Sequence, residues 1–211
     1  RYETVGGVSP LNANMRNIKE KLETEIKSRD IDIPIFIGHR NVEPLIIRTV
    51  NEMKESGASR CLAWLSSPYS SYSSCRQYTE NIENACSQID NAPQIDQIRR
   101  HHDHPGLIEP AADCLRSAIE EIPNALRDET VLLFSAHSLP LSAAETCSYV
   151  DEINEASRLI AERVDPEGNH CWEVVWQSRS GPPQVPWLIP DVCDRIDELA
   201  AEGVPAIAVS P

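Results

Sequence analysis

The stretch TVLLFSAHSLP, Thr130 to Pro140, decides the fold class. Its opening letters, TVLLF, form a nearly continuous apolar run, which is typical of a parallel strand buried on both faces. The run then ends in Ser-Ala-His-Ser, and Pro140 closes the segment. In open α/β sheets, ligands bind beyond the carboxyl ends of the strands. We therefore expect His137 to lie at the sheet edge where such folds carry out chemistry.

Similar β-type runs alternate with helical patterns along the chain. The runs cover residues 32–40, 59–67, 93–100, 130–137, 171–178 and 205–210. The helix-period segments cover residues 12–29, 43–56, 75–89, 106–122, 148–164 and 191–202. This alternation predicts βαβ units and an α/β fold. We expect two Rossmann-like halves, residues 1–95 and 96–211, with parallel sheets flanked by helices and a cleft between the halves.

Composition excludes two classes of partner. The 211 residues carry a formal net charge of −14, and a nucleic-acid binder needs a basic surface to neutralise phosphates. No apolar run approaches the roughly 20 residues that span a bilayer, and no signal-peptide pattern is seen. We expect a cytoplasmic protein with no nucleic-acid partner and no membrane span.

The cysteines predict reduced thiols. They are widely spread, odd in number and without a C-x-x-C pair, which does not fit a disulfide framework. A metal or cluster ligand among them is the alternative. The seven are Cys61, Cys75, Cys86, Cys114, Cys147, Cys171 and Cys193.

Histidines supply the first candidates for chemistry. An imidazole titrates at about pH 6.5, so His137 suits a proton acceptor or a neutral metal ligand; a hydrogen-bonded histidine at a strand end is the alternative. The letters HHDHP, residues 101–105, are of metal-ligating type. Histidines so close in sequence cannot readily converge on one ion, so we expect an exposed polar turn there.

Three loops are candidates for ligand binding. The serine-rich letters WLSSPYSSYSSCRQY, residues 64–78, place tyrosines beside Arg76, which suits a flat aromatic ligand with carboxylates; a solvated connection is the alternative. The letters GGVSP, residues 6–10, offer backbone amides and a hydroxyl to an anion. The proline-rich residues 176–192 are either a rigid cleft wall or a plain connector.

Four of these segments together resemble the ferrochelatase family. They are RYETVGGVSPLN (1–12), SSYSSCRQY (70–78), FSAHSLP (134–140) and WQSRSGPPQVPWLIPDV (176–192). They occur in the family's order and spacing, and the likeness covers essentially the whole chain. It is closest to bacterial members that metallate coproporphyrin III. The resemblance implies a chelatase-type fold and the insertion of ferrous iron into coproporphyrin III in heme biosynthesis.

The resemblance also implies a role for His137. It matches the active-site histidine that faces the porphyrin centre, where it accepts pyrrole protons, contacts the substrate iron, or both. A neutral imidazole can accept a proton near neutral pH. Trp176 and Trp187 fall in the segment that lines the cleft, and no chemical role is assigned to them.

Porphyrin-binding residues follow from the same resemblance. Arg1 and Tyr2 match a pair that borders the macrocycle and its propionates, and Ser9 and Tyr78 match residues that hydrogen-bond those carboxylates. Binding energy from these contacts can bend the ring, so that nitrogen lone pairs turn toward the incoming metal.

Some parts that the resemblance implies are absent from the 211 residues. The family pairs the histidine with a glutamate shortly after the strand that here ends at Pro211. Its N-terminal strand and loop carry a tyrosine that can ligate product iron. We therefore expect this chain to correspond to the middle of the enzyme, with poor or no turnover by itself.

Cys75 raises the question of a cofactor. Some bacterial members hold a [2Fe–2S] cluster with one cysteine in the serine-rich loop and three near the C-terminus, and Cys75 matches the lone internal ligand. Because such a cluster needs four ligands, we expect it only in a full-length protein with further cysteines beyond Pro211. An ordinary loop thiol is the alternative.

The resemblance leaves alternatives open. The substrate could be protoporphyrin IX, or the chain could be a non-catalytic tetrapyrrole-binding module. A chelatase for another metal or ring, such as cobalt and sirohydrochlorin, is a third class. The implied partners are a porphyrin and ferrous iron, and contacts with neighbouring heme-pathway enzymes are also expected.

Overall fold

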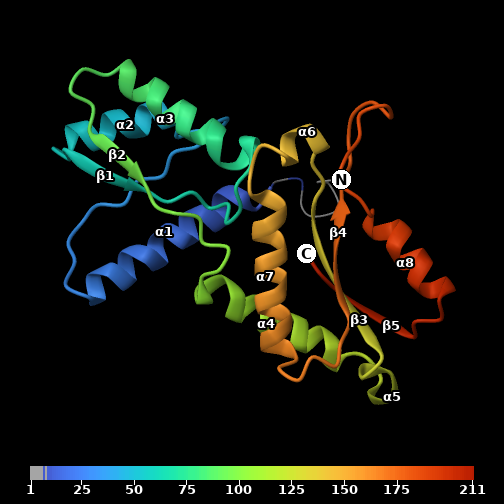
Figure 1. Cartoon of the computed structure of the whole chain (residues 1–211). Helices are drawn as coiled ribbons and strands as arrows, with labels where there is room; N and C mark the ends of the chain where they lie inside the picture. Colours follow the sequence, from blue (N-terminus) through green and yellow to red (C-terminus); the bar gives the residue numbers. More distant parts are fainter. Residues whose placement is uncertain (1–6, 8) are drawn as a thin grey trace. The chain divides into compact units, whose positions relative to one another are not determined.

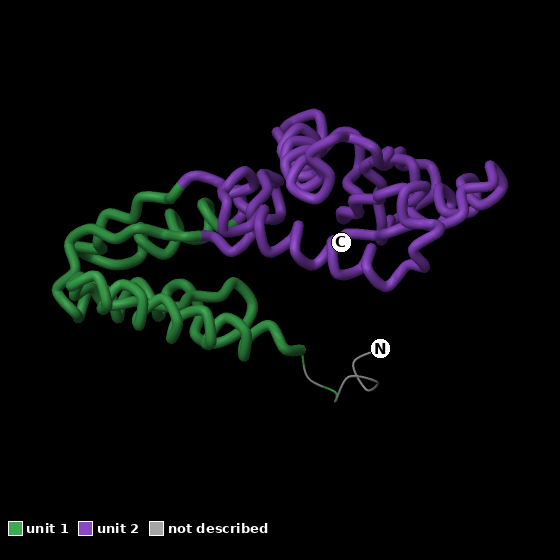
Figure 2. The backbone as a smooth tube through the Cα atoms, turned by 90° about the horizontal axis from the view of Figure 1, so that it is seen from below, with its two compact units in different colours: residues 1–64, 78–98 green, residues 65–77, 99–211 purple. Residues whose placement is uncertain are grey.

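The computed structural model describes residue 7 and residues 9–211, so the predicted site residues Arg1 and Tyr2 lie outside the described residues. The chain forms two compact units, which Figure 2 shows in different colours. The first unit takes in the chain up to residue 64 and residues 78–98, and the second takes in residues 65–77 and 99–211. The predicted domain boundary between residues 95 and 96 stays a prediction.

The first unit contains helices and a two-stranded parallel sheet. Its elements are α1 (Leu11–Ser28), α2 (Ile46–Glu55), β1 (Arg60–Ala63), α3 (Gln77–Ser87) and β2 (Gln94–Gln97). In the sheet, Arg60 lies opposite Gln94. Val50 of α2 packs with Ala85 and Ile89, and these buried side chains form the small core of this unit.

The predicted strand at residues 32–40 is wrong. In the described part of the chain this stretch forms no strand, and its one β-type contact is an isolated bridge from His39 to Leu45. Pro34 lies within it and has no N–H to donate to a ladder. Each of the other predicted β-type runs contains an observed strand.

The second unit is built on a parallel sheet with the strand order β4-β3-β5. Its strands are β3 (Thr130–His137), β4 (Trp172–Gln177) and β5 (Ala206–Ser210), and its longer helices are α4 (Pro105–Glu120), α7 (Tyr149–Val164) and α8 (Val192–Ala201). Short helical turns α5 (Asn124–Arg127) and α6 (Leu141–Ala144) precede and follow β3, and a π-helix, η2 (Tyr72–Arg76), lies in the segment 65–77 of this unit. Among the described residues, no helix is both long and apolar enough to span a bilayer.

Strand β3 is covered on both faces, as predicted. Its first six residues are buried. Leu132 and Phe134 pack with α4 and α7, whereas Val131 and Leu133 pack with α8. Figure 1 shows α4 and α7 on one side of this sheet and α8 on the other. Full burial of one such aliphatic side chain contributes about 1.5–3 kcal/mol, so the strand is a rigid base for its carboxyl end.

Side-chain caps fix where two of the flanking helices begin. Nδ1 of His104 accepts a hydrogen bond from the Gly106 N–H at 3.0 Å at the start of α4. The Asp191 carboxylate accepts from the Cys193 N–H at 2.8 Å at the start of α8. Gly203, with φ of +86°, follows the end of α8, a conformation that glycine adopts without strain.

Candidate functional site

His137 is the last residue of β3 and lies opposite Gln177 of β4. Its side chain is exposed. In the described part of the chain, no hydrogen bond or ion pair engages either ring nitrogen. This arrangement favours an imidazole that can serve a ligand over one that is committed to the fold.

The peptide bond after His137 is held from two sides. Its carbonyl oxygen accepts a hydrogen bond from the Tyr149 hydroxyl at 3.0 Å, and its N–H, which belongs to Ser138, donates to the Gln177 carbonyl at 2.8 Å. Because a peptide unit is planar, these two bonds fix its orientation. They therefore limit the direction in which the His137 side chain leaves the strand.

The proline-rich segment runs alongside the residues that follow His137. The Ser138 hydroxyl is buried and donates to the Leu188 carbonyl at 3.0 Å. The Leu188 N–H donates to the Leu139 carbonyl at 2.9 Å, and the Leu141 N–H donates to the Pro186 carbonyl at 3.0 Å. These contacts favour the rigid wall over the plain connector.

The two tryptophans of this segment have different surroundings. Trp176 is buried and belongs to a core cluster with Tyr149 and Ile153. The indole Nε1 of Trp187 is also buried, and it has no hydrogen-bond partner in the described part of the chain. Trp176 is therefore a structural residue, and its ring supports the strand end from inside.

Tyr149 links the strand end to the serine-rich loop. Its ring lies 6.1 Å from the Tyr69 ring in an edge-to-face arrangement and 6.0 Å from the Trp176 ring. Burial, followed by the charges that Tyr69 and Cys147 would carry, raises the pKa of Tyr149 to about 12. The hydroxyl therefore keeps its proton and remains a donor to His137 at neutral pH.

The serine-rich loop is ordered by its own hydroxyl groups. The Ser71 hydroxyl accepts from the Ser74 N–H at 3.1 Å, while the Ser74 hydroxyl accepts from the Ser71 N–H at 3.0 Å. This reciprocal cap begins η2, which contains Cys75. The Cys75 thiol donates to the Ser71 carbonyl at 3.2 Å. The loop is therefore ordered, and its predicted role in ligand binding stays a prediction.

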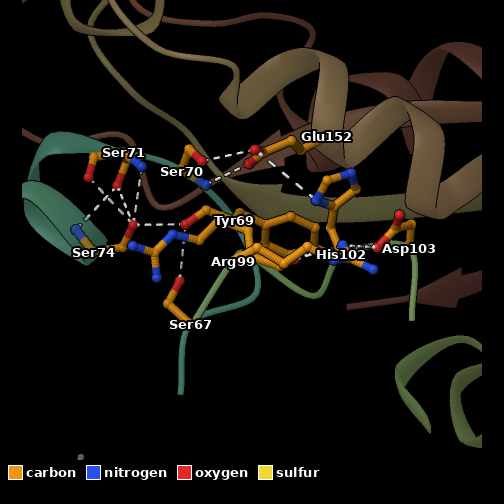
Figure 3. A network of polar contacts seen from close by, with 10 residues as sticks. Ser67, Tyr69, Ser70, Ser71, Ser74, Arg99, His102, Asp103 and Glu152 are labelled. Atoms are coloured by element: carbon orange, nitrogen blue, oxygen red, sulfur yellow. Dashed lines mark hydrogen bonds and ion pairs between the residues drawn. The ribbon is translucent and has the colours of Figure 1, made fainter. Parts of the chain in front are cut away.

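A carboxylate from α7 anchors the loop. Glu152 accepts hydrogen bonds from the Ser70 N–H at 2.5 Å and the Ser70 hydroxyl at 2.7 Å. On its other side, Nδ1 of His102 lies 3.9 Å from the nearer carboxylate oxygen. Figure 3 shows the Glu152 carboxylate between these two residues. Sequence reasoning missed this contact, because 82 positions separate Ser70 from Glu152.

The predicted polar turn at residues 101–105 is present, but it is not wholly exposed. The His102 side chain is 20% exposed, and its buried Nδ1 has no hydrogen-bond partner in the described part of the chain. His104 caps α4 instead of binding a ligand. Across the described residues, no cluster of His, Cys, Asp and Glu side chains is suited to hold a metal ion.

Two predicted binding residues belong to the first unit. Ser9 is exposed, and its hydroxyl accepts from the Leu11 N–H at 3.3 Å near the start of α1. Tyr78 is half-buried in the first turn of α3, and the Arg40 guanidinium lies 5.3 Å from the centre of its ring. His137 and Cys75 belong to the second unit.

A second histidine lies at the opposite end of the sheet from His137. His170 precedes β4, and its Nδ1 lies 3.0 Å from the Asp165 carboxylate while its Nε2 lies 3.1 Å from the Arg127 carbonyl. Both neighbours are acceptors, and only a protonated ring can donate to both at once. Burial alone raises the pKa of Asp165, but the hydrogen bonds and charge of His170 lower it to below its ordinary value.

Comparisons with known proteins show which family the sequence matches. A sequence model described as Ferrochelatase matches residues 1–211. The chain is 41% identical to a coproporphyrin III ferrochelatase of Nocardia farcinica and 37% identical to one of Streptomyces coelicolor, with 100% of the chain covered in both. It is also 41% identical over 94% of its length to a ferrochelatase of Rhodopirellula baltica. The chain spans 56–61% of the length of these three curated relatives.

Proposed function

The chain belongs to the ferrochelatase family, and on this premise we propose that the natural protein inserts ferrous iron into coproporphyrin III in heme biosynthesis. The relatives named coproporphyrin III ferrochelatase support this choice of substrate. The single observation that carries the proposal is the His137 ring, which is exposed and without a partner among the described residues at the carboxyl end of β3.

The reaction requires a base and no change of oxidation state. A metal-free porphyrin carries two pyrrole N–H protons, and Fe²⁺ takes their place as the four ring nitrogens bind it. In our proposal, a neutral His137 accepts the two pyrrole protons one after the other through a ring nitrogen and passes each to solvent. The same nitrogen is also suited to contact the iron before it enters the ring.

The backbone around His137 serves this role by keeping the imidazole in place. The peptide bond after it is hydrogen-bonded on both sides, and the buried Ser138 hydroxyl ties the next residue to the proline-rich segment. A base whose direction is set before the substrate arrives loses little entropy in reaching the reactive geometry.

Propionate binding is the second part of the proposal. By resemblance we assign it to Arg1, Tyr2, Ser9 and Tyr78. A guanidinium and hydroxyl donors are chemically suited to carboxylates, and charge-assisted hydrogen bonds of this kind are the stronger ones. Local donors of this type are needed because the net charge of −14 repels an anionic porphyrin.

The [2Fe–2S] cluster has weaker support. Cys75 is the candidate ligand, but the described residues bring no group of further His, Cys, Asp or Glu side chains together for a metal, and such a cluster needs four ligands. The described residues alone therefore do not fit the cluster. Its presence in the natural protein stays a prediction, checked by the iron and sulfide content of anaerobically purified protein. A cytoplasmic location and contacts with neighbouring heme-pathway enzymes are likewise predictions.

The proposal is tested by metal insertion under anaerobic conditions. The natural protein is mixed with Fe²⁺ and coproporphyrin III, and the visible spectrum follows formation of the iron porphyrin. We expect a rate well above the uncatalysed one, a lower rate with protoporphyrin IX, and loss of the enhancement in His137→Ala. Binding of coproporphyrin without metal insertion would instead indicate a tetrapyrrole carrier, and undiminished activity in His137→Ala would reject the assigned base.

A further inference from the structure

The first turn of α7 contacts two segments that the proposed function needs. Tyr149 and Glu152 lie three positions apart, so their side chains project from neighbouring points of the helix surface. The Tyr149 hydroxyl donates to the His137 carbonyl at 3.0 Å. Glu152 accepts both hydrogen-bond donors of Ser70. One helical turn therefore holds the end of β3 and the serine-rich loop together.

The packing around Tyr149 holds its hydroxyl in one position. The residue is 8% exposed, and its ring lies between Tyr69 and Trp176. A ring packed in this way has little rotational freedom, so the hydroxyl can act as a fixed support for the peptide bond after His137. Tyr69 precedes Ser70 in the loop, and the aromatic contact therefore joins the same two segments a second time.

Glu152 is an unusual anchor, because its charge is largely removed from solvent. Its side chain is 12% exposed, and Nδ1 of His102 lies 3.9 Å from its carboxylate. After burial, the charge of Glu152 is the second cause that raises the pKa of Tyr69. Ser70 supplies the close hydrogen bonds. A buried carboxylate that loses its donors is costly, so the fold holds Ser70, and the capped turn that leads to Cys75, firmly in place.

We propose that Tyr149 and Glu152 are positioning residues, which together fix the His137 imidazole and the serine-rich loop relative to each other. This inference rests on the proposed function for its effect on catalysis. Tyr149 acts through the peptide bond after His137, and Glu152 acts through Ser70. Neither side chain touches the porphyrin in this account, so loss of the Tyr149 hydroxyl lowers the rate of metal insertion and leaves porphyrin affinity almost unchanged.

A double-mutant cycle tests the role of Tyr149. Tyr149→Phe removes one hydroxyl and keeps the ring, and we expect kcat for metal insertion to fall about three- to tenfold, the range for one lost hydrogen bond, with KM for coproporphyrin III unchanged. In a His137→Ala background the same change should have no further effect on the residual rate, because the imidazole that the Tyr149 hydroxyl positions is then absent. An equal loss in both backgrounds would overturn the proposal.

Hydrogen exchange tests Glu152 independently of activity. In Glu152→Ala we expect faster amide exchange in peptides covering residues 65–77, and in Glu152→Gln a smaller increase, since the amide oxygen can still accept from the Ser70 N–H. Asp151→Asn is the matched control, because this neighbouring acid is exposed. In this variant, the amides of residues 65–77 should exchange as fast as in the wild type. Tyr149→Phe should likewise accelerate exchange in residues 136–140.

Failure of the proposed function and failure of the positioning role give different results. If the wild-type natural protein inserts no metal, the proposed function fails, whereas the exchange measurements still decide whether α7 holds the two segments. If Glu152→Ala and Tyr149→Phe exchange as the wild type does in residues 65–77 and 136–140, the positioning role is wrong, even in an active enzyme. In Tyr149→Phe, a KM that rises in step with any fall in kcat would also contradict it, because it would place Tyr149 in substrate binding.

Discussion

The two ends of the sheet in the second unit each carry a histidine, and the two imidazoles have opposite surroundings. At the amino end, both nitrogens of His170 face acceptor oxygens, one from Asp165 and one from Arg127, and its side chain is 15% exposed. At the carboxyl end, His137 is exposed, and in the described part of the chain its ring has no partner. A ring whose nitrogens are both engaged has nothing left for a ligand. The contrast separates a histidine that stabilises the fold from one that is available for chemistry.

The largest expected effect is on catalysis by His137→Ala. Loss of a general base typically lowers a rate about 100- to 10,000-fold, so we expect metal insertion to fall at least about 100-fold. The exposed ring contributes little to folding, and the free energy of unfolding in urea should stay within about 0.5 kcal/mol of the wild type. If His137→Ala is destabilised and retains activity, His137 is a structural residue and the role assigned to it here is wrong.

His170→Ala should show the reverse pattern. The substitution removes both contacts of the ring, to the Asp165 carboxylate and to the Arg127 carbonyl, while the N–H groups of Gly168 and of residue 170 still donate to Asp165. We expect a loss of about 2 kcal/mol in the free energy of unfolding. Metal insertion by the folded variant should be unchanged. Urea denaturation followed by circular dichroism measures the first quantity. An unchanged midpoint would show that the amino end of the sheet is held by other contacts.

The pH dependence of the free energy of unfolding tests whether the charge of Asp165, the partner of His170, stabilises the fold. The pKa of Asp165 is below its ordinary value in the folded protein, so its carboxylate contributes stability above the unfolded pKa of about 3.9. That contribution is lost as the pH falls through the folded pKa. Asp165→Asn should therefore be less stable than the wild type at neutral pH, with a gap that narrows at acid pH. A gap that stays constant down to about pH 3 would show that the charge of Asp165 does not contribute.

A smaller effect is expected at the residue next to His137. Ser138→Ala removes the buried hydroxyl that donates to the Leu188 carbonyl, and we expect a loss of about 1 kcal/mol in the free energy of unfolding. Ser142 is exposed, and Ser142→Ala is the matched control, with an expected change within about 0.5 kcal/mol. If the two variants are equally stable, the proline-rich segment does not depend on Ser138.

Much of the fold follows from local sequence patterns. The apolar letters of β3 predicted a strand buried on both faces, because burial on both faces removes the need for polar alternation. The helical pattern predicted over residues 191–202 contains α8, and Gly203 follows its end with a positive φ, which glycine adopts without strain. The stretch at residues 32–40 shows the limit of such patterns. Its apolar letters resemble a strand, but a strand exists only through pairing, and Pro34 weakens the ladder.

The candidate site was predictable in part. The position of His137 at a strand end followed from the run before it and from the general location of ligands in α/β folds. The contacts that hold its surroundings did not follow, because Tyr149 and Glu152 meet their partners through tertiary packing. An acid in the first turn of a helix, such as Glu152, is ordinarily explained by the helix dipole alone. Its link to Ser70 was therefore invisible in the sequence.

Histidine-selective NMR tests the central claim most directly. The chain has six histidines, and the spectra of His137→Ala and His170→Ala assign the two rings of interest. On addition of metal-free coproporphyrin III to the natural protein, we predict a large shift of the His137 ring signals and unchanged His170 signals. Unchanged His137 signals in a protein that binds the porphyrin would contradict the claim that this imidazole faces the substrate.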